Sequence, residues 1–343
     1  MPTTVVVTGA SAGVGRAVAL EFARQGCKVA LLARRKERLD SAAREARALG
    51  VEALSIPVDV ADAGAVDAAA ERIEHELGPV DVWVNDAMAT IFAPVHAIAA
   101  EEFRRVTEVT YLGQVHGTLA ALKRMRPRNR GTIIQVGSAL SYRAIPLQSA
   151  YCAAKFAIRG FTDSLRTELK HEGSRVRLTM VQLPAVNTPQ FDWGRSRVPN
   201  MAQPLAPIFQ PEAIAREVVR AAREAPRELW IGGSTLRAII GTMLFPDFGD
   251  RILANEGYSG QLASEPRDEG RPDNLFEAPP GDPGAHGRFD GHAGADVHGY
   301  DPSWLRAGAL LAVLGLVAGA FVIGRSSNPG GAPRRALTEG RLQ

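Results

Sequence analysis

The sequence has few cysteines, no basic stripe and no charged-then-apolar leader. Only two of its 343 residues are cysteines, Cys27 and Cys152, which excludes a disulfide framework and is typical of a reducing compartment. The formal net charge is +3 and the positive residues are scattered, so we predict no nucleic-acid partner. The chain begins directly with an apolar, strand-like run, which predicts that a secretory signal peptide is absent.

The composition changes near residue 262. Residues 1–262 alternate short apolar runs with amphipathic stretches, whereas residues 263–305 hold six Pro, seven Gly and nine acidic residues against three basic ones. Such a bias is far from the composition of a folded domain and indicates an acidic, flexible linker. We therefore expect one domain over residues 1–262 and a linker over residues 263–305.

Residues 307–324 are eighteen consecutive uncharged residues between Arg306 and Arg325. As a helix they would span about 27 Å, close to the thickness of a bilayer's hydrocarbon core. We predict a transmembrane helix over residues 306–325, followed by a basic tail over residues 326–343. The alternative is a buried or interfacial helix.

Apolar runs bounded by turn residues alternate with amphipathic stretches along the first 262 residues. The predicted strands are residues 3–8, 28–33, 53–58, 80–84, 131–136, 176–182 and 228–231. The predicted helices are residues 13–25, 36–49, 63–77, 101–126, 149–172 and 211–224. This alternation predicts an α/β fold with a single Rossmann-type, doubly wound parallel sheet of about seven strands, and ligands at the carboxyl ends of the strands.

Tyr151 and Lys155 lie four residues apart in an alanine-rich run with helical spacing, so their side chains leave one helix face one turn apart. A positive charge beside a phenol favours the phenolate, so Lys155 is expected to lower the pKa of Tyr151. Ser138 ends an apolar run thirteen residues upstream. Each signal alone is weak, because such a pair is more often a helix-surface contact and a serine after a strand more often a turn residue.

A glycine-rich turn follows the first predicted strand. Glycine at positions 9, 13 and 15 lets the backbone turn tightly and approach a pyrophosphate, while the next helix directs its amides at that anion. An ordinary tight turn is the plain alternative.

The second predicted strand ends in Ala33-Arg34-Arg35, where an NAD site usually carries an acid. Two guanidiniums offer forked donors to a 2′-phosphate, which favours NADP(H) over NAD(H), although they are also consistent with the start of a charged helix. Asp59 and Val60 follow the third strand and are candidate adenine contacts, with a helix cap as the alternative for Asp59.

Residues 3 to about 232 resemble the short-chain dehydrogenase/reductase family, on Thr8 to Gly15, Ser138, Tyr151 and Lys155 in this order and spacing. The resemblance implies that Tyr151 donates the proton in carbonyl reduction, Lys155 lowers its pKa and holds the nicotinamide ribose, and Ser138 hydrogen-bonds the substrate oxygen. The cofactor would supply the hydride. The cofactor-binding residues that we expect are Thr8, Gly9, Ser11, Gly13, Val14, Gly15, Arg34, Arg35, Asp59, Val60, Asn85, Tyr151, Lys155, Pro184 and Thr188.

Three positions depart from the pattern of that family. Its Asn-Asn-Ala-Gly element reads Asn85-Asp86-Ala87-Met88 here, which places a carboxyl group and a thioether where an amide and a glycine are usual. Its helix-four asparagine, part of a water-mediated proton path, aligns with Thr110, and its Pro-Gly pair reads Pro184-Ala185. These changes put cofactor fit and proton relay in question.

Residues 186–210 contain several aromatic residues and prolines after the sixth strand. They are interpreted as a substrate lid with an apolar lining, or equally as a stiff loop whose aromatic rings pack on the core. A lipid-like substrate follows from the first interpretation. His286, His292 and His298 recur every six residues, a spacing that fits no compact ligand pattern, so we predict no metal site.

Together these observations predict an NADP(H)-dependent enzyme that interconverts a carbonyl and an alcohol on a small, apolar substrate. The positive tail favours a cytoplasmic C-terminus, but a reduced cofactor and the missing signal sequence favour a membrane-anchored protein with its catalytic domain in the cytoplasm. The family resemblance implies a homodimer or homotetramer. The competing hypothesis is a nucleotide-binding membrane scaffold that has lost turnover, motivated by Asp86, Met88 and Thr110.

Overall fold

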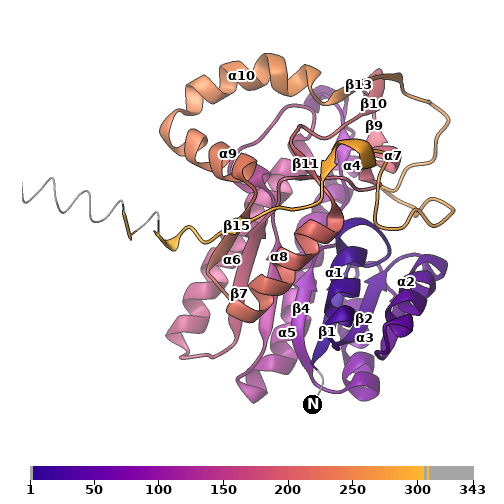
Figure 1. Cartoon of the computed structure of the whole chain (residues 1–343), viewed down its shortest axis with the longest axis vertical. Helices are drawn as coiled ribbons and strands as arrows, with labels where there is room; N and C mark the ends of the chain where they lie inside the picture. The colour runs from indigo at the N-terminus through magenta and orange to yellow at the C-terminus, as the bar shows by residue number, and fades with distance from the viewer. Residues whose placement is uncertain (1–2, 305–306, 309–343) are drawn as a thin grey trace, which may run out of the picture. The chain divides into compact units, whose positions relative to one another are not determined.

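The computed structural model describes residues 3–304, 307 and 308, and its centre is a parallel sheet (Figure 1). Its parallel strands are β1 (Thr4–Thr8), β2 (Lys28–Ala33), β3 (Ala53–Pro57), β4 (Val80–Asn85), β6 (Thr132–Val136), β7 (Arg177–Gln182) and β12 (Glu228–Ile231). They are ordered β12-β7-β6-β4-β1-β2-β3, and β15 (Gly299–Tyr300) adds an antiparallel strand beside β12. The prediction of a Rossmann-type parallel sheet is confirmed.

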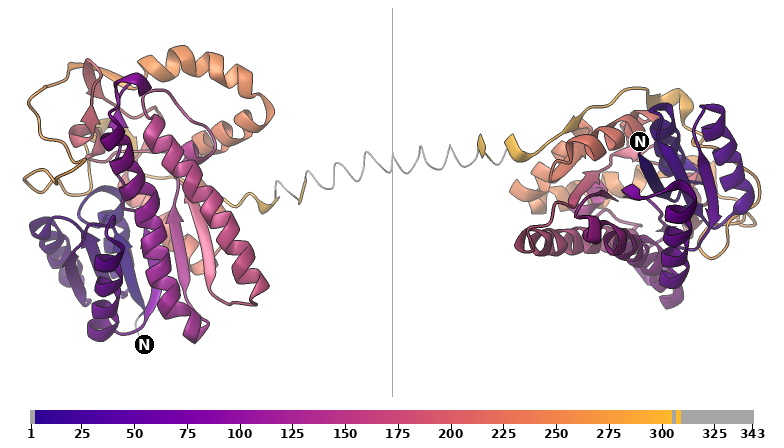
Figure 2. Two further views of the ribbon diagram at one scale, coloured as in Figure 1. Left: turned by 180° about the vertical axis from the view of Figure 1, so that it is seen from behind. Right: turned by 90° about the horizontal axis from the view of Figure 1, so that it is seen from below.

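Helices cover both faces of this sheet. One face carries α1 (Gly13–Arg24), α2 (Lys36–Ala48) and α8 (Pro211–Glu224), and the other carries α3 (Ala63–Leu77), α5 (Gly113–Arg128) and α6 (Ser149–His171) (Figures 1 and 2). Strand β1 shows why the sequence requires two layers. Val5 and Val7 belong to one apolar cluster and Val6 to the other, and all three are fully buried. Because successive side chains of a strand point to opposite faces, a run of valines needs cover on both sides.

The predicted helix over residues 101–126 is interrupted. It consists of α4 (Ala100–Thr107), a π-helical turn (Glu108–Leu112) and α5. Within the wider turn, the buried Thr110 hydroxyl accepts from the Ala89 amide at 2.9 Å and donates to the Ala89 carbonyl at 2.8 Å. Thr110 therefore fastens the segment after β4 to this helix, and its hydroxyl is already engaged there.

Short elements gather at the carboxyl end of the sheet (Figure 1). Sequence periodicity missed α9 (Gly233–Leu244) and α10 (Pro246–Ser259), which follow β12. The remaining strands pair as β8 (Ala185–Val186) and β14 (Ala293–Gly294) on either side of β11 (Ile208–Phe209), β10 (Asn200–Ala202) with β13 (Leu262–Pro266), and β5 (Ile91–Phe92) with β9 (Arg195–Ser196). Single helical turns are α7 (Gln190–Trp193) and the 3-10 segments Val95–Ala97, Ala139–Ser141 and Asp290–His292.

The prediction of a flexible linker over residues 263–305 is wrong for the part of that segment up to residue 301. This part belongs to the same compact unit as the preceding residues and supplies β13, β14 and β15. Its acidic residues pair with arginines of the domain, as Asp282 does with Arg16 and Asp273 with Arg195. A segment rich in Pro and Gly cannot form its own core, but this one packs on a surface formed elsewhere in the sequence.

The predicted transmembrane helix over residues 306–325 and the tail over residues 326–343 lie outside the described residues, apart from Ala307 and Gly308. Within the described ranges, 3–304 and 307–308, no helix combines the length and the hydropathy needed to cross a bilayer.

Candidate functional site

The glycine-rich turn joins β1 to α1. Gly9 and Gly13 have φ angles of 74° and 57°, a region that favours glycine. A Cβ on Gly15 would lie 2.6 Å from the Gly9 carbonyl oxygen, so no larger residue fits. Helix α1 begins without a side-chain cap and without an acidic residue in its first turn. Its amino end is therefore suited to bind an anion such as a pyrophosphate, as predicted.

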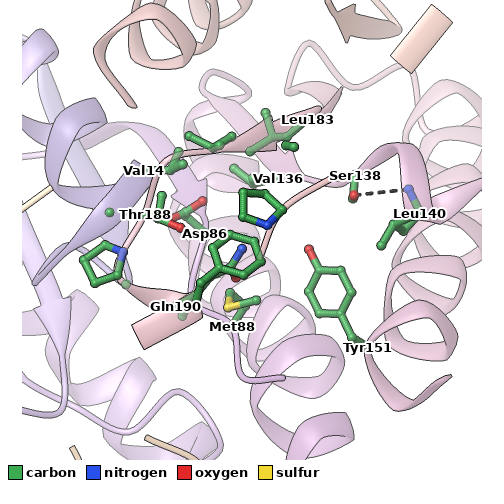
Figure 3. A pocket seen from close by; sticks show the side chains of 18 of the residues that line it. Val14, Asp86, Met88, Val136, Ser138, Leu140, Tyr151, Leu183, Thr188 and Gln190 are labelled. Atoms are coloured by element: carbon green, nitrogen blue, oxygen red, sulfur yellow. Dashed lines mark hydrogen bonds between the residues drawn. The ribbon is translucent and has the colours of Figure 1, made fainter. Parts of the chain in front are cut away.

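A cavity of about 410 Å³ lies beside this turn, at the carboxyl ends of the strands (Figure 3). Its wall brings together the predicted residues Gly9, Ser11, Gly13, Val14, Arg34, Arg35, Asp59, Val60, Ser138, Tyr151, Lys155, Pro184 and Thr188. Most of them follow the strands β1, β2, β3, β6 and β7, and Tyr151 and Lys155 lie on α6. Their functional roles stay predictions, but the fold places all of them on one cavity.

Three predicted cofactor residues do not line the cavity and instead support its wall. The Thr8 hydroxyl accepts from the amides of Asp86 and Ala87 at 3.0 and 3.1 Å. The Asn85 amide group donates to Thr118 and Gln135 and accepts from Trp83, all inside the core. Gly15 packs against the backbone of Gly9, as described above. The sequence motif does not separate such supporting positions from lining ones.

Ser138 and Tyr151 direct their hydroxyl groups into the cavity from different elements (Figure 3). Ser138 follows β6, where its amide donates to the Gln182 side chain at 2.9 Å and its hydroxyl caps the next turn by accepting from Leu140 at 3.1 Å. Tyr151 lies in the first turn of α6. The strand end and the helix therefore hold two hydroxyl groups that face each other.

Lys155 lies one helical turn after Tyr151 and is 2% exposed. Its ammonium group donates to the Val136 carbonyl at 2.7 Å and lies 5.4 Å from the centre of the Tyr151 ring. Burial lowers the pKa of Lys155 to about 8, although the Asp86 carboxylate opposes this effect.

The pKa of Tyr151 is raised in this structure, opposite to the direction predicted from its spacing to Lys155. Burial raises the pKa of the phenol above its ordinary value, and the nearby Cys152 and Asp86 raise it further, against a lowering by the hydrogen bond with Ser138. Spacing alone could not show this direction, because burial is the largest cause of the shift. The phenol is therefore held in its protonated form.

Asp86 is a titratable residue that the sequence showed only as a departure from a family pattern. Its carboxylate lies beside Gly15, since a Cβ on that glycine would be 2.8 Å from Oδ2. Burial raises the pKa of Asp86 to about 6, while the charge of Lys155 and the Gly15 amide favour ionisation. The site thus contains a carboxyl group between the glycine turn and the predicted catalytic lysine.

The predicted 2′-phosphate residues are already engaged. Arg34 and Arg35 donate to main-chain carbonyl oxygens of residues 274–278, and Arg38 donates to those of residues 279–281. Asp59 pairs with Arg105 and accepts from the Ala61 amide at 3.0 Å. Arg38 was missed, although it stands four residues after Arg34 in a basic run that could have indicated it.

The remaining part of the cavity wall is mostly apolar. From the predicted lid over residues 186–210, Phe191 and Trp193 line the cavity, whereas Met201 and Phe209 do not. Phe191 also packs against Phe92 and Phe289, so the lid and core interpretations both apply to it. Leu205, also from the predicted lid, lines the cavity, and further lining residues that sequence analysis missed are Leu140, Ile145, Ala238 and Leu253.

Comparisons with known proteins agree with this geometry. Residues 3–196 match the sequence profile of the family described as short chain dehydrogenase. The oxidoreductase YxnA of Bacillus subtilis is 32% identical over 80% of this chain and 78% of its own length. The 3-dehydrosphinganine reductase of Danio rerio is 31% identical over 63% of this chain and 67% of its own. An alcohol dehydrogenase of the archaeon Thermococcus sibiricus, solved with 5-hydroxy-NADP, is similar in structure with a TM-score of 0.57 and 29% identity, covering 67% of this chain and 96% of that one.

Proposed function

Because the chain belongs to the short-chain dehydrogenase family, we propose that it is an NADP(H)-dependent oxidoreductase that interconverts a carbonyl and an alcohol. The observation that carries the proposal is the position of Ser138, Tyr151 and Lys155 on one cavity with the glycine-rich turn. Such a site fits a nicotinamide dinucleotide along the turn and a small carbonyl compound beside the two hydroxyl groups.

In this proposal a bound nicotinamide cofactor supplies the hydride. Ser138 and Tyr151 bind the substrate oxygen, on which negative charge develops, and their fixed positions stabilise that charge without reorganisation. Tyr151 then gives up its hydroxyl proton to this oxygen. The raised pKa of Tyr151 keeps the proton in place until an alkoxide, a stronger base than a phenolate, has formed.

Lys155 has two roles in the proposed reaction. Its ammonium stabilises the phenolate that remains on Tyr151 after proton transfer, and it also donates to hydroxyl groups of the cofactor's ribose. Asp86 supports the charged form of Lys155, since its carboxylate opposes the lowering of the lysine pKa by burial. Asp86 is therefore a positioning residue that acts through Lys155.

Three arginines support NADP(H) rather than NAD(H). Arg34, Arg35 and Arg38 line the cavity at the end of β2, and no acidic residue stands at the β2 end to repel a 2′-phosphate. The archaeal alcohol dehydrogenase was solved with an NADP derivative, which agrees with this choice.

The apolar wall supports a hydrophobic carbonyl substrate. Leu140, Ile145, Leu205 and Leu253 line the same cavity as Ser138 and Tyr151. A hydrophobic wall favours substrates that bury aliphatic surface. Similarity to a 3-dehydrosphinganine reductase agrees with a long-chain ketone.

A cofactor-oxidation screen tests the proposal. Purified full-length protein is mixed with NADPH and a panel of ketones and aldehydes that ranges from short-chain to long-chain compounds, and absorbance at the NADPH band is followed. We expect oxidation that increases with the apolar length of the carbonyl compound. Binding of NADPH without turnover across the whole panel would instead support the nucleotide-binding scaffold.

A further inference from the structure

Residues 273–284, which we call the strap, cross the arginine-lined end of the cavity. Arg34 donates to the carbonyl oxygens of Asn274 and Phe276 at 2.5 and 2.8 Å. Arg35 donates to that of Ala278 at 3.0 Å, and Arg38 to that of Gly281 at 2.6 Å. Every arginine that the proposed function assigns to the 2′-phosphate therefore has a main-chain carbonyl as its present partner.

Several contacts fasten the strap to the domain, including the ion pair of Asp273 with Arg195. Leu275 is fully buried within the apolar cluster that includes Val58 and Val60, next to the proposed adenine position. At the other end the Asp282 carboxylate pairs with the buried Arg16. Leu275 thus acts as an apolar anchor and Asp282 as an ionic one.

The strap also reaches the glycine-rich turn. The Gly13 amide donates to the Gly284 carbonyl at 3.2 Å, and this amide belongs to the helix end that suits a pyrophosphate. The strap therefore follows the proposed path of the dinucleotide from the arginines to the glycine turn. Asn274, Ala278 and Pro279 form part of the cavity wall along that path.

Carbonyl oxygens are weaker partners for guanidinium groups than phosphate oxygens. Both kinds of bond have a charged donor, but a phosphate is also a charged acceptor that a guanidinium can bind with two parallel hydrogen bonds. The strap's carbonyls carry no full negative charge, and the arginines lie close together: burial and the neighbouring Arg35 and Arg34 lower the pKa of Arg38, against a raising by Asp282. A dianionic phosphate is thus able to displace the carbonyls.

We propose that the strap is a gate on the adenosine end of the cofactor site, which must leave Arg34, Arg35 and Arg38 before the 2′-phosphate can bind them. The inference rests on the proposed function and adds a way in which cofactor binding is regulated. The closed strap competes with the cofactor for the same guanidinium donors. Apparent affinity then falls in proportion to the fraction of molecules in which the strap is open.

Two substitutions loosen the strap at its separate anchors. Leu275→Ser removes the apolar anchor, and Asp282→Asn removes the ionic one. Glu277→Ala is the matched control, because Glu277 lies in the strap, is exposed and has no polar partner among the described residues. None of these three residues is assigned to the catalytic machinery.

The experiment follows NADPH association by stopped-flow fluorescence and the equilibrium binding of adenosine 2′,5′-bisphosphate, with full-length protein. For the wild type and Glu277→Ala we expect an association rate that levels off with NADPH concentration, because strap opening becomes limiting. In Leu275→Ser this plateau rises about tenfold, and the bisphosphate binds about tenfold more tightly. Asp282→Asn changes both quantities in the same direction.

Unchanged plateaus and affinities in both loosened variants would overturn the gate. Weaker binding in both would overturn it too, because the strap would then be part of the binding surface. If Leu275→Ser loses the native circular-dichroism spectrum, the plateau and the bisphosphate affinity of Asp282→Asn alone decide between the gate and its rejection. If neither the wild type nor any variant binds NADPH, the proposed function fails and the gate with it.

Discussion

The two ends of the cavity differ in how their polar groups are satisfied. At the end with Ser138 and Tyr151, both hydroxyl groups face the cavity and each other. At the end with Arg34 and Arg38, the guanidiniums are held by carbonyl oxygens of a segment some 240 residues later in the chain. The first end therefore presents the hydroxyl groups that the proposed reaction uses, whereas at the second end the arginine donors are occupied by the protein's own carbonyl oxygens.

This difference separates catalysis from access. The hydroxyl groups of Ser138 and Tyr151 are oriented by the sheet and α6, which are parts of the core, so their geometry does not depend on the strap. The arginines must lose their hydrogen bonds to the strap's carbonyl oxygens before they can bind the phosphate of a cofactor. Substitutions at the first end should therefore alter turnover, and substitutions at the second should alter binding.

The largest effect is expected at the first end. Tyr151→Phe removes the hydroxyl proton that the proposed reaction transfers to the substrate oxygen, and loss of a general acid typically lowers the rate about 10²- to 10⁴-fold. Because the phenyl ring fills the same space, NADPH affinity should change less than about threefold. Steady-state kinetics with an accepted carbonyl compound, together with NADPH titration, measures the two effects. Full activity of Tyr151→Phe would remove Tyr151 from the proposed mechanism.

Asp86→Asn tests how the buried carboxyl group at the first end makes the stability of the protein depend on pH. Because the pKa of Asp86 is raised to about 6, the folded protein holds a proton that the unfolded chain releases between about pH 4 and 6. Wild-type stability should therefore fall relative to the variant as the pH rises through this window. The relative change is about 2–3 kcal/mol in the free energy of unfolding.

Urea unfolding at pH 4.5, 5.5 and 6.5 measures this change. Asp81→Asn is a useful control, since Asp81 lies near the opposite end of the same strand and pairs with Arg130 at the surface. Parallel stability curves for the wild type and Asp86→Asn would show that Asp86 does not carry the raised pKa.

Arg34→Gln tests the second end. The substitution removes a forked cationic donor, and each charge-assisted hydrogen bond is worth about 1.5–3 kcal/mol. We expect the ratio of NADPH to NADH affinity to fall about 10- to 100-fold, mainly through weaker NADPH binding. The exposed Arg44 on α2 provides a matched control as Arg44→Gln, which should keep the wild-type ratio. An unchanged ratio in Arg34→Gln would separate this arginine from cofactor choice.

The parallel sheet was predictable because its signals are local. Runs such as Val5 to Val7 need cover on both faces, and the predicted bounds of the parallel strands differ from the observed ones by no more than one residue at either end. Helices α9 and α10 were missed because large apolar residues such as Met243 and Leu244 are exposed there, while few others, such as Ile239, are buried. The strand β15 was missed because two residues carry too little periodicity.

The placement of Tyr151 and Lys155 on one cavity was predictable for the same reason, since the two residues are held at fixed spacing within one helix. The hydrogen-bond partners of Arg34 could not be predicted from the sequence. They are main-chain carbonyl oxygens, which every residue has and which leave no side-chain pattern. The pKa of Tyr151 was also wrongly predicted from spacing alone. Its direction depends mainly on burial, with smaller contributions from Cys152 and from Asp86, which follows β4.

The smallest effect concerns the segment just after the strap. His286 contacts Glu212 of α8 at 2.9 Å and Asp290 at 2.6 Å, while Asp290 also accepts from Asn187 and Gln210. Burial lowers the pKa of His286, but hydrogen bonds and charges of the two carboxylates outweigh it, so the pKa is raised. The contact is then complete below about pH 6.5 and is lost as the pH rises through the raised pKa.

Loss of this partly exposed contact should ease strap opening only slightly, because such ion pairs contribute less than about 1 kcal/mol. We expect the plateau of the NADPH association rate to rise about two- to threefold between pH 6 and pH 8.5 in the wild type. In His286→Gln the plateau should be high and nearly independent of pH. The control is His75→Gln on α3, far along the chain from the strap, which should keep the wild-type profile. If the plateau still depends on pH in His286→Gln, another titratable group controls strap opening. If the wild-type plateau does not depend on pH, the contacts of His286 with Glu212 and Asp290 are not coupled to strap opening.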